Sequence, residues 1–185
     1  MPKATVYFLA PLMLLSLPAH AQLSLEIIEK LVRSSYAIPH LTCQYLGQQM
    51  ASADSAHYLL FDTRAPEEYS TSHIRSAIQV EPELSAEEFM KTHGAALKDK
   101  HAVFYCSVGY RSSIFARRVQ AEVLRAGARS VANLRGGIFR WYNEAHPVVD
   151  ANGETDNIHP YDSFWRVLIH DRKKDKRKNH DLPQH

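Results

Sequence analysis

The sequence predicts an α/β protein with a central, mostly parallel β-sheet flanked by helices. Residues 58–61 and 102–105 are continuous apolar runs of strand length. Continuous rather than alternating hydrophobicity is typical of strands that are covered on both faces. Helix-like stretches separate such runs along the chain, as expected for a parallel sheet. With 185 residues, of which 45% are hydrophobic and 23% charged, the chain has the composition of a globular protein with one core.

The first element expected in the folded protein is a helix within an N-terminal extension that spans residues 22–40. Apolar residues recur there at helical spacing behind Ser24, whose side chain suits an N-cap, and Pro39 ends the segment. The apolar residues are Leu25, Ile28, Val32 and Tyr36. We expect this helix to lie on the main body of the domain, followed by a short helix at about residues 42–50.

Strands and helices then alternate up to about residue 142. The strand at 58–61 ends at Asp62, and the strand at 102–105 leads directly to Cys106. A helix with an apolar stripe follows from about Ser112 and stops at Gly127, which suits a helix C-terminus. By the same criteria we expect short strands at 78–80 and 131–134, a capped helix that begins near residues 85–88, and a helical stretch at 139–142. Asp62 and Cys106 thus stand at the carboxyl ends of strands, where sites form in such sheets.

Cys106 is the candidate nucleophile. It opens the run Cys-Ser-Val-Gly-Tyr-Arg at a turn from strand to helix, where unpaired backbone N–H groups and the positive end of the helix dipole both favour a thiolate. Backbone N–H groups of the turn could also hold an anion. The candidate anion-binding residues are Ser107, Val108, Gly109, Tyr110, Arg111 and Ser112. Gly109 allows a sharp backbone curl, and Arg111 adds a planar cation.

Four blocks of sequence, in one order along residues 41–149, support a family assignment. They are Leu60-Phe-Asp62-Thr-Arg64 with Glu67-Glu68-Tyr69, then Ser72-His73-Ile74-Arg-Ser76-Ala77-Ile78, then Cys106-x-x-Gly109-x-Arg111-Ser112, and finally Leu134-Arg-Gly136-Gly137-Ile-x-x-Trp141. Together they resemble a single rhodanese domain, the fold of thiosulfate sulfurtransferases. The second block departs from the family pattern, because Ser72 and Ser76 stand where the family has glycine.

The resemblance implies a double displacement. The Cys106 thiolate takes the outer sulfur of a thiosulfate-like donor, and a thiol or cyanide-like acceptor later removes it from the persulfide. The Ser107–Ser112 backbone and Arg111 would hold the anion, while Asp62 and Arg64 would support the loops. No cofactor or metal is implied. A small-molecule donor and acceptor are the expected partners, with a protein sulfur acceptor as a further candidate.

Two other functions stay open. A rhodanese-like module could hold a persulfide or an anion for a partner without turning over by itself. Phosphatase or arsenate-reductase chemistry is a lesser alternative. Cys106 to Arg111 spans six residues, whereas the loops of those related enzymes span seven. The smaller ring suits a single sulfur atom better than a tetrahedral phosphoryl group. No Asp or Glu lies within the loop, so we favour sulfur transfer.

Residues 1–21 have the pattern of a secretory signal peptide. Lys3 precedes an apolar run at 6–17, and Ala19-His20-Ala21 supplies a small-x-small cleavage site. We therefore expect a periplasmic or secreted protein with no membrane span after cleavage. The alternative is a membrane anchor through an uncleaved N-terminus, although the apolar run is shorter than the roughly 20 residues that a spanning helix needs.

The C-terminal part divides into an extension at 150–170 and a basic tail at 171–185 that we expect to be disordered. Residues 172–178 hold six basic residues and account for the net charge of +2. Basic residues are not interleaved with aromatic ones on a folded face, so nucleic-acid binding is not expected. Cys43 is predicted to be a packing residue. A disulfide between Cys43 and Cys106 is an open alternative in an exported protein.

Overall fold

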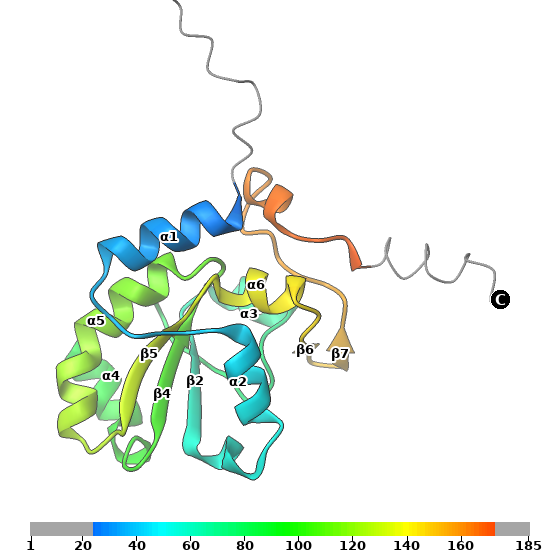
Figure 1. Ribbon diagram of the computed structural model, residues 1–185. Coiled ribbons are helices and arrows are strands. Elements are labelled where there is room, and N and C mark those ends of the chain that lie inside the picture. Colours follow the sequence, from blue (N-terminus) through cyan, green and yellow to red (C-terminus); the bar gives the residue numbers. More distant parts are fainter. Residues whose placement is uncertain (1–23, 173–185) are drawn as a thin grey trace, which may run out of the picture.

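The computed structural model describes residues 24–172 and confirms the predicted α/β fold (Figure 1). Within these residues, five parallel strands form one sheet in the order β1-β5-β4-β2-β3. Their bounds are β1 His40–Leu41, β2 Tyr58–Asp62, β3 Ile78–Gln79, β4 His101–Tyr105 and β5 Ser130–Leu134. All four predicted strands are present, and β1 is an additional edge strand of two residues.

Helices cover both faces of this sheet (Figure 1). The α-helices in the described residues are α1 Leu25–Ser35, α2 Cys43–Met50, α3 Pro66–Thr71, α4 Ala86–His93, α5 Tyr110–Arg125 and α6 Gly137–Asn143. Val103 and Tyr105 of β4 belong to the core cluster that includes α1, α2 and α6. Ala102 and Phe104 belong to the cluster that includes α4 and α5. Alternate residues of β4 therefore enter different cores, which explains its continuous apolar run.

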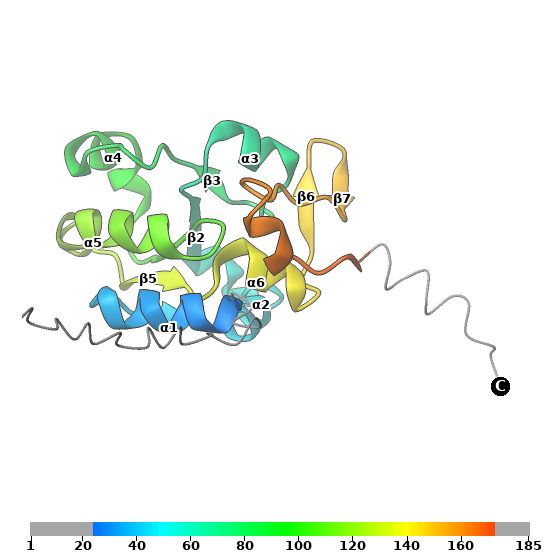
Figure 2. The same ribbon diagram turned by 90° about the horizontal axis from the view of Figure 1, so that it is seen from above.

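Helix α1 lies across the carboxyl-terminal edge of the sheet (Figures 1 and 2). The Ser24 side chain caps it by accepting a hydrogen bond of 3.3 Å from the Ile27 backbone N–H. Leu25, Ile28 and Val32 are buried, as the helical spacing predicts. The helix ends at Ser35, and the chain then continues in an extended form into β1. The N-terminal extension is thus part of the packed domain.

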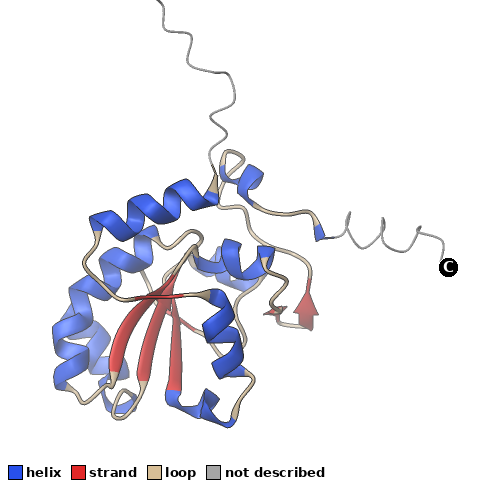
Figure 3. Cartoon of the chain, viewed as in Figure 1, coloured by secondary structure: helices blue, strands red, loops and turns tan. Residues whose placement is uncertain are grey.

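The chain after α6 also packs on the domain. Strands β6 (Val148–Asp150) and β7 (Gly153–Thr155) form an antiparallel hairpin, shown at one side of the sheet in Figure 3. Val149 exchanges two backbone hydrogen bonds of 2.9 Å with His73, so β6 is tied to the loop after α3. A short 3₁₀ helix at Trp165–Leu168 follows, with Leu168 buried in the core. The predicted boundary after residue 149 falls inside β6.

Two predicted segments lie outside the described residues: the signal peptide at 1–21 and nearly all of the basic tail at 171–185. Within residues 24–172, no helix combines the length and the apolar character needed to cross a bilayer.

Candidate active site at the end of strand β4

The loop from Cys106 to Gly109 joins β4 to α5, and the helix starts at Tyr110, two residues earlier than predicted. Gly109 adopts a left-handed conformation with φ of 91°, and its backbone N–H lies 3.2 Å from Cys106 Sγ and donates to it. A Cβ atom at Gly109 would lie 3.1 Å from Asn133 Nδ2. The backbone angle therefore favours glycine, and the close approach leaves little room for a side chain.

Cys106 is one of the residues that line a pocket of about 490 Å³. The pocket is bounded by α1, by the loop at 106–111 and by the segment at 161–165; we call it the cysteine pocket. The side chain is packed closely, since only 1% of the residue is exposed. Cys106 therefore lines the cysteine pocket although very little of its own surface is exposed.

The segment at 134–141 supports the cysteine loop through backbone hydrogen bonds. The Cys106 carbonyl accepts a hydrogen bond of 2.9 Å from the Ile138 N–H, and the Ser107 carbonyl accepts one of 3.0 Å from the Phe139 N–H. A Cβ atom at Gly137 would come within 2.2 Å of the Cys106 carbonyl oxygen. Gly137 therefore permits the contact between α6 and the loop, and it explains one glycine of the closing sequence block.

Asn133, near the end of β5, braces the other side of the loop. Its Nδ2 donates to the Gly109 carbonyl at 3.2 Å, and its Oδ1 accepts from the Ser112 hydroxyl at 2.6 Å. The Ser113 hydroxyl donates to the same Gly109 carbonyl at 2.7 Å. All three side chains are fully buried. Sequence reasoning missed Asn133, because its role depends on the adjacency of β5 and β4.

Arg111 is bound to Glu68 of α3. Its NH1 and NH2 groups donate to the two carboxylate oxygens at 2.8 and 2.9 Å, and the Ser107 hydroxyl donates to the same carboxylate at 2.9 Å. The sequence predicts Arg111 as an anion-binding residue. In the structure it has a carboxylate partner, because α3 places Glu68 against the cysteine loop. Glu68 was noticed only as part of a sequence block, and its contact with the loop was missed.

The Glu68–Arg111 pair has consequences for charge. Burial alone would raise the pKa of the Glu68 carboxyl, but hydrogen bonds from Arg111, Ala65 and Ser107 and the charge of Arg111 lower it below its usual value. Burial alone would lower the pKa of Arg111, but Glu68 and the nearby Cys106 raise it. Glu68 is therefore ionised at neutral pH, and it compensates the charge of Arg111.

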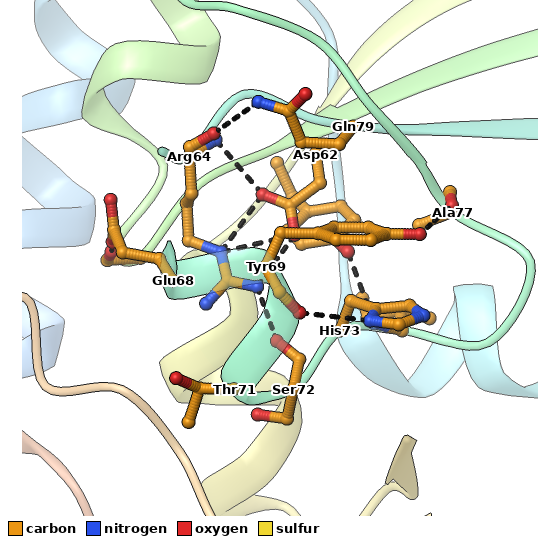
Figure 4. Close-up of polar contacts among 12 residues, drawn as sticks. Asp62, Arg64, Glu68, Tyr69, Thr71, Ser72, His73, Ala77 and Gln79 are labelled. Carbon is orange, nitrogen blue, oxygen red and sulfur yellow. Dashed lines mark hydrogen bonds and ion pairs between the residues drawn. The ribbon is translucent and has the colours of Figure 1, made fainter. Parts of the chain in front are cut away.

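Asp62 and Arg64, the two predicted supporting residues, form a fully buried ion pair at the end of β2 (Figure 4). Arg64 NH2 lies 2.7 Å from Asp62 Oδ2 and also donates to the Ser72 carbonyl at 2.6 Å. Gln79 donates to the Arg64 carbonyl at 2.9 Å. The ion pair thus ties β2 to the loop after α3, and the Arg64 carbonyl links the same segment to β3. The loop-supporting role of these two residues stays a prediction.

The two serines that replace family glycines differ in strain. Ser72 is extended, with φ of −172°, a conformation open to any residue. Ser76 has φ of 64°, in the left-handed region that side chains rarely adopt. The loop keeps the backbone shape that glycine would favour at position 76, and the serine is strained there.

Cys43 differs from Cys106 although it is equally buried. Its thiol is placed to donate to the Arg135 carbonyl, at 3.7 Å, and burial together with nearby Glu144 and Glu29 raises its pKa. Both cysteines are free thiols in the structure. Cys43 therefore packs in the core, as predicted. Among residues 24–172, no group of three His, Cys, Asp or Glu side chains is arranged to hold a metal ion.

The protein has a parallel α/β sheet, and a cysteine loop whose backbone turns at Gly109 follows strand β4. Comparisons with known proteins identify the family that has this arrangement. The family model of the rhodanese-like domain matches residues 42–144. A sulfurtransferase of Allochromatium vinosum is 30% identical over 116 residues, which cover 63% of this chain and 99% of the relative. The chain therefore belongs to the rhodanese-like domain family, and this membership indicates a sulfurtransferase-like function in general.

Solved structures support the fold. A thiosulfate sulfurtransferase from Pseudomonas aeruginosa superimposes with a TM-score of 0.52 at 20% identity, over 78% of this chain and 26% of that protein. An As-Sb reductase from Leishmania major superimposes with a TM-score of 0.51 at 19% identity, over 58% of this chain and 78% of that protein. At this level of identity, the two likenesses show a shared fold and do not distinguish between the two chemistries.

Proposed function

We propose that the protein moves a sulfane sulfur from a thiosulfate-like donor to a thiophilic acceptor through a persulfide on Cys106. The observation that carries this proposal is the hydrogen bond from the Gly109 N–H to Sγ of Cys106, a residue that lines the cysteine pocket. A backbone donor of this kind favours a sulfur that carries negative charge. Membership of the rhodanese-like family supports the same conclusion.

In the first step, the Cys106 thiolate attacks the outer sulfur of the donor. A new S–S bond forms, the old bond to that sulfur breaks, and sulfite leaves with the bonding electron pair when thiosulfate is the donor. In the second step, a thiolate or cyanide attacks the terminal sulfur and regenerates the Cys106 thiolate. We assign the backbone N–H groups of Ser107–Ser112 to stabilising the negative charge in both steps.

Arg111 acts in this proposal together with Glu68. The paired guanidinium fixes the Ser107 hydroxyl at 3.0 Å and contributes positive charge near Cys106. Glu68 itself bears on the phosphatase alternative. Its lowered pKa keeps the carboxylate ionised near neutral pH, so it has no proton to give to a leaving oxygen. This observation favours sulfur transfer over phosphate-ester hydrolysis.

Incubation of the purified protein with sulfane donors, followed by intact mass measurement, tests the proposal. We expect the protein to gain one sulfur atom, the gain to reverse with cyanide or a thiol, and Cys106→Ser to abolish it. Cys43→Ser is the matched control and should gain sulfur like the unchanged protein. No gain with any sulfane donor would exclude the proposed chemistry.

A sulfur-carrier role is the second candidate, because the bidentate contact with Glu68 leaves Arg111 less free to draw in a donor anion. A carrier gains sulfur but turns over slowly with small molecules. Steady formation of thiocyanate from a sulfane donor and cyanide would favour the enzyme. A single loading without further turnover, with release of sulfur only to a protein acceptor, would favour the carrier.

We also propose export, on the basis of the signal pattern at residues 1–21. N-terminal sequencing of the protein recovered from its native host should show a chain that starts at Gln22. An intact Met1 in a membrane fraction would instead support the anchored alternative.

A further inference from the structure

The walls of the cysteine pocket come mainly from outside the part of the chain that defines the family. Five lining residues lie between positions 28 and 36 and two between 161 and 165, against five in the loop at 106–111. The family match covers only residues 42–144. The shape of the pocket is therefore set largely by the N-terminal helix and by the C-terminal extension.

Helix α1 supplies an aliphatic wall. Ile28, Leu31 and Val32 line the pocket, and Leu31 remains 60% exposed. The helix is fixed rather than loosely laid on the domain, because the buried Glu29 carboxylate accepts from Arg140 Nε of α6 at 2.6 Å. The wall is therefore a permanent apolar surface next to the cysteine.

Aromatic side chains supply the rest of the enclosure. Tyr36 and Tyr110 meet edge to face with ring centres 5.8 Å apart, and both line the pocket. Tyr161 and Trp165 of the C-terminal extension line it as well. Tyr161 has φ of 70°, a strained backbone for a bulky residue, and its ring lies 4.9 Å from the Arg111 guanidinium carbon. Strain of this kind is typical of residues held in place at a binding site.

The charge of the cysteine pocket is nearly balanced. Arg111 is the charged residue among the lining residues, and Glu68 already binds it at 2.8 and 2.9 Å. Tyr161, whose ring lies next to the Arg111 guanidinium, adds no positive charge to the pocket. Thiosulfate would bring two negative charges beside a thiolate, and the cost of removing such an ion from water is high unless cations compensate it. An apolar donor with one charge fits this pocket better.

We propose that the sulfur donor of this protein is a singly charged organic sulfane compound whose apolar group, about the size of an aromatic ring, binds between α1 and Tyr161. This inference rests on the proposed function. The volume of about 490 Å³ lies in the usual range for small-molecule sites, roughly 300–1,000 Å³. With a thiosulfonate, the Cys106 thiolate bonds to the outer sulfur, the bond from that sulfur to the sulfonyl sulfur breaks, and a sulfinate leaves with the electron pair.

The test compares rates of persulfide formation with three donors: benzenethiosulfonate, methanethiosulfonate and thiosulfate. The first two share one charge and one leaving-group type and differ only in the apolar group. We expect benzenethiosulfonate to react at least about tenfold faster than methanethiosulfonate, because the phenyl group removes more apolar surface from water. Thiosulfate should be the slowest of the three.

Two variants on the same helix separate the pocket wall from general effects. Leu31→Ala should lower the rate with benzenethiosulfonate about fivefold and leave the rate with methanethiosulfonate nearly unchanged. Ile27→Ala is the matched control, since Ile27 is 47% exposed and does not line the pocket. It should leave both rates within about 1.5-fold, given how little a surface truncation costs.

The charge balance is tested with Glu68→Gln, which leaves the Arg111 charge uncompensated. The ratio of the thiosulfate rate to the methanethiosulfonate rate should rise at least about threefold, and a ratio is insensitive to a general loss of activity. An unchanged ratio would overturn the inference. So would thiosulfate reacting as fast as benzenethiosulfonate, or equal effects of Leu31→Ala and Ile27→Ala. These results leave the proposed function standing, whereas no persulfide from any donor removes both.

Discussion

Strands β2 and β4 are neighbours whose carboxyl ends lie side by side, with Asp62 paired to Tyr105 in the sheet register. The residues that follow them are used in different ways. After β2, the ion pair of Asp62 and Arg64 is sealed from solvent and holds loops together. After β4, Cys106 lines a pocket, and the nearby ion pair of Arg111 and Glu68 is partly open, with 26% of the Arg111 side chain exposed.

The difference teaches that two charged pairs at one sheet edge can serve stability and chemistry separately. The Asp62–Arg64 pair has no access to solvent, and its contacts hold loops together. A pair that contacts both the cysteine loop and the pocket can also set the charge that a substrate meets. Four predictions test this division, from the largest expected effect to the smallest.

Asp62→Asn should destabilise the protein by about 3–5 kcal/mol, because the Arg64 guanidinium would be left buried without a compensating charge. Urea unfolding measures this. Glu154→Gln is the matched control: it removes the same charge from an exposed pair, in which the side chains of Arg75 and Glu154 are 61% and 66% exposed, and should cost less than about 0.5 kcal/mol. Similar losses in both variants would contradict the structural role of the buried pair.

Iodoacetamide at neutral pH should modify Cys106 at least about a hundredfold faster than Cys43, because a thiol with a raised pKa and a carbonyl partner stays protonated. The two rates are measured by mass spectrometry in the single-cysteine variants Cys43→Ala and Cys106→Ala. Both cysteines are only 1% exposed, so exposure alone predicts equal rates. Equal rates would mean that the pocket gives no access to Cys106.

Glu68→Gln should destabilise the protein by about 1.5–3 kcal/mol at pH 7, since it removes charged hydrogen bonds to Arg111 and Ser107. The folded-state pKa of Glu68 is lowered. Its contribution is therefore fully present above the ordinary pKa of a glutamate and is lost as the pH falls through the lowered value. The free energies of unfolding of the variant and the unchanged protein should begin to approach each other below about pH 4 and should converge once the pH is below the lowered folded-state pKa of Glu68. A gap that persists there would contradict this origin.

Ser76→Gly should stabilise the protein by about 0.5–1 kcal/mol, because relief of the left-handed backbone strain outweighs the extra flexibility of glycine in the unfolded chain. Thermal unfolding measures the gain. Ser76→Ala keeps the Cβ atom and the strain, and it should show no such gain. Since Ser76 is exposed and far from the cysteine loop in sequence, sulfur uptake should not change.

The sequence predicted those parts of the site that depend on local order. The apolar run before Cys106 and the helix after it are contiguous, so the strand, the turn and the glycine could be inferred together. Helix α1 was also predicted, because its apolar spacing is regular. Strand β1 was missed, since two residues give no recognisable pattern.

The parts that were missed depend on contacts between distant residues. Glu68 and Arg111 are 43 positions apart in the chain, and they meet only because α3 follows β2 and α5 follows its neighbour β4. Asn133 reaches Gly109 because β5 adjoins β4. The pocket walls require the docking of α1 and of the C-terminal extension, which the spacing of apolar residues does not specify.

The location of the pocket walls at the two ends of the chain has an evolutionary consequence. The loop at 106–111 is braced from α6 and β5, whereas Leu31 and Tyr161 are half exposed and belong to neither support. Replacement of the terminal segments would exchange the chemical preference of the protein while its reactive centre stayed intact. Sequence changes that alter the preferred substrate would then lie in the terminal segments, outside residues 42–144, which the family model covers.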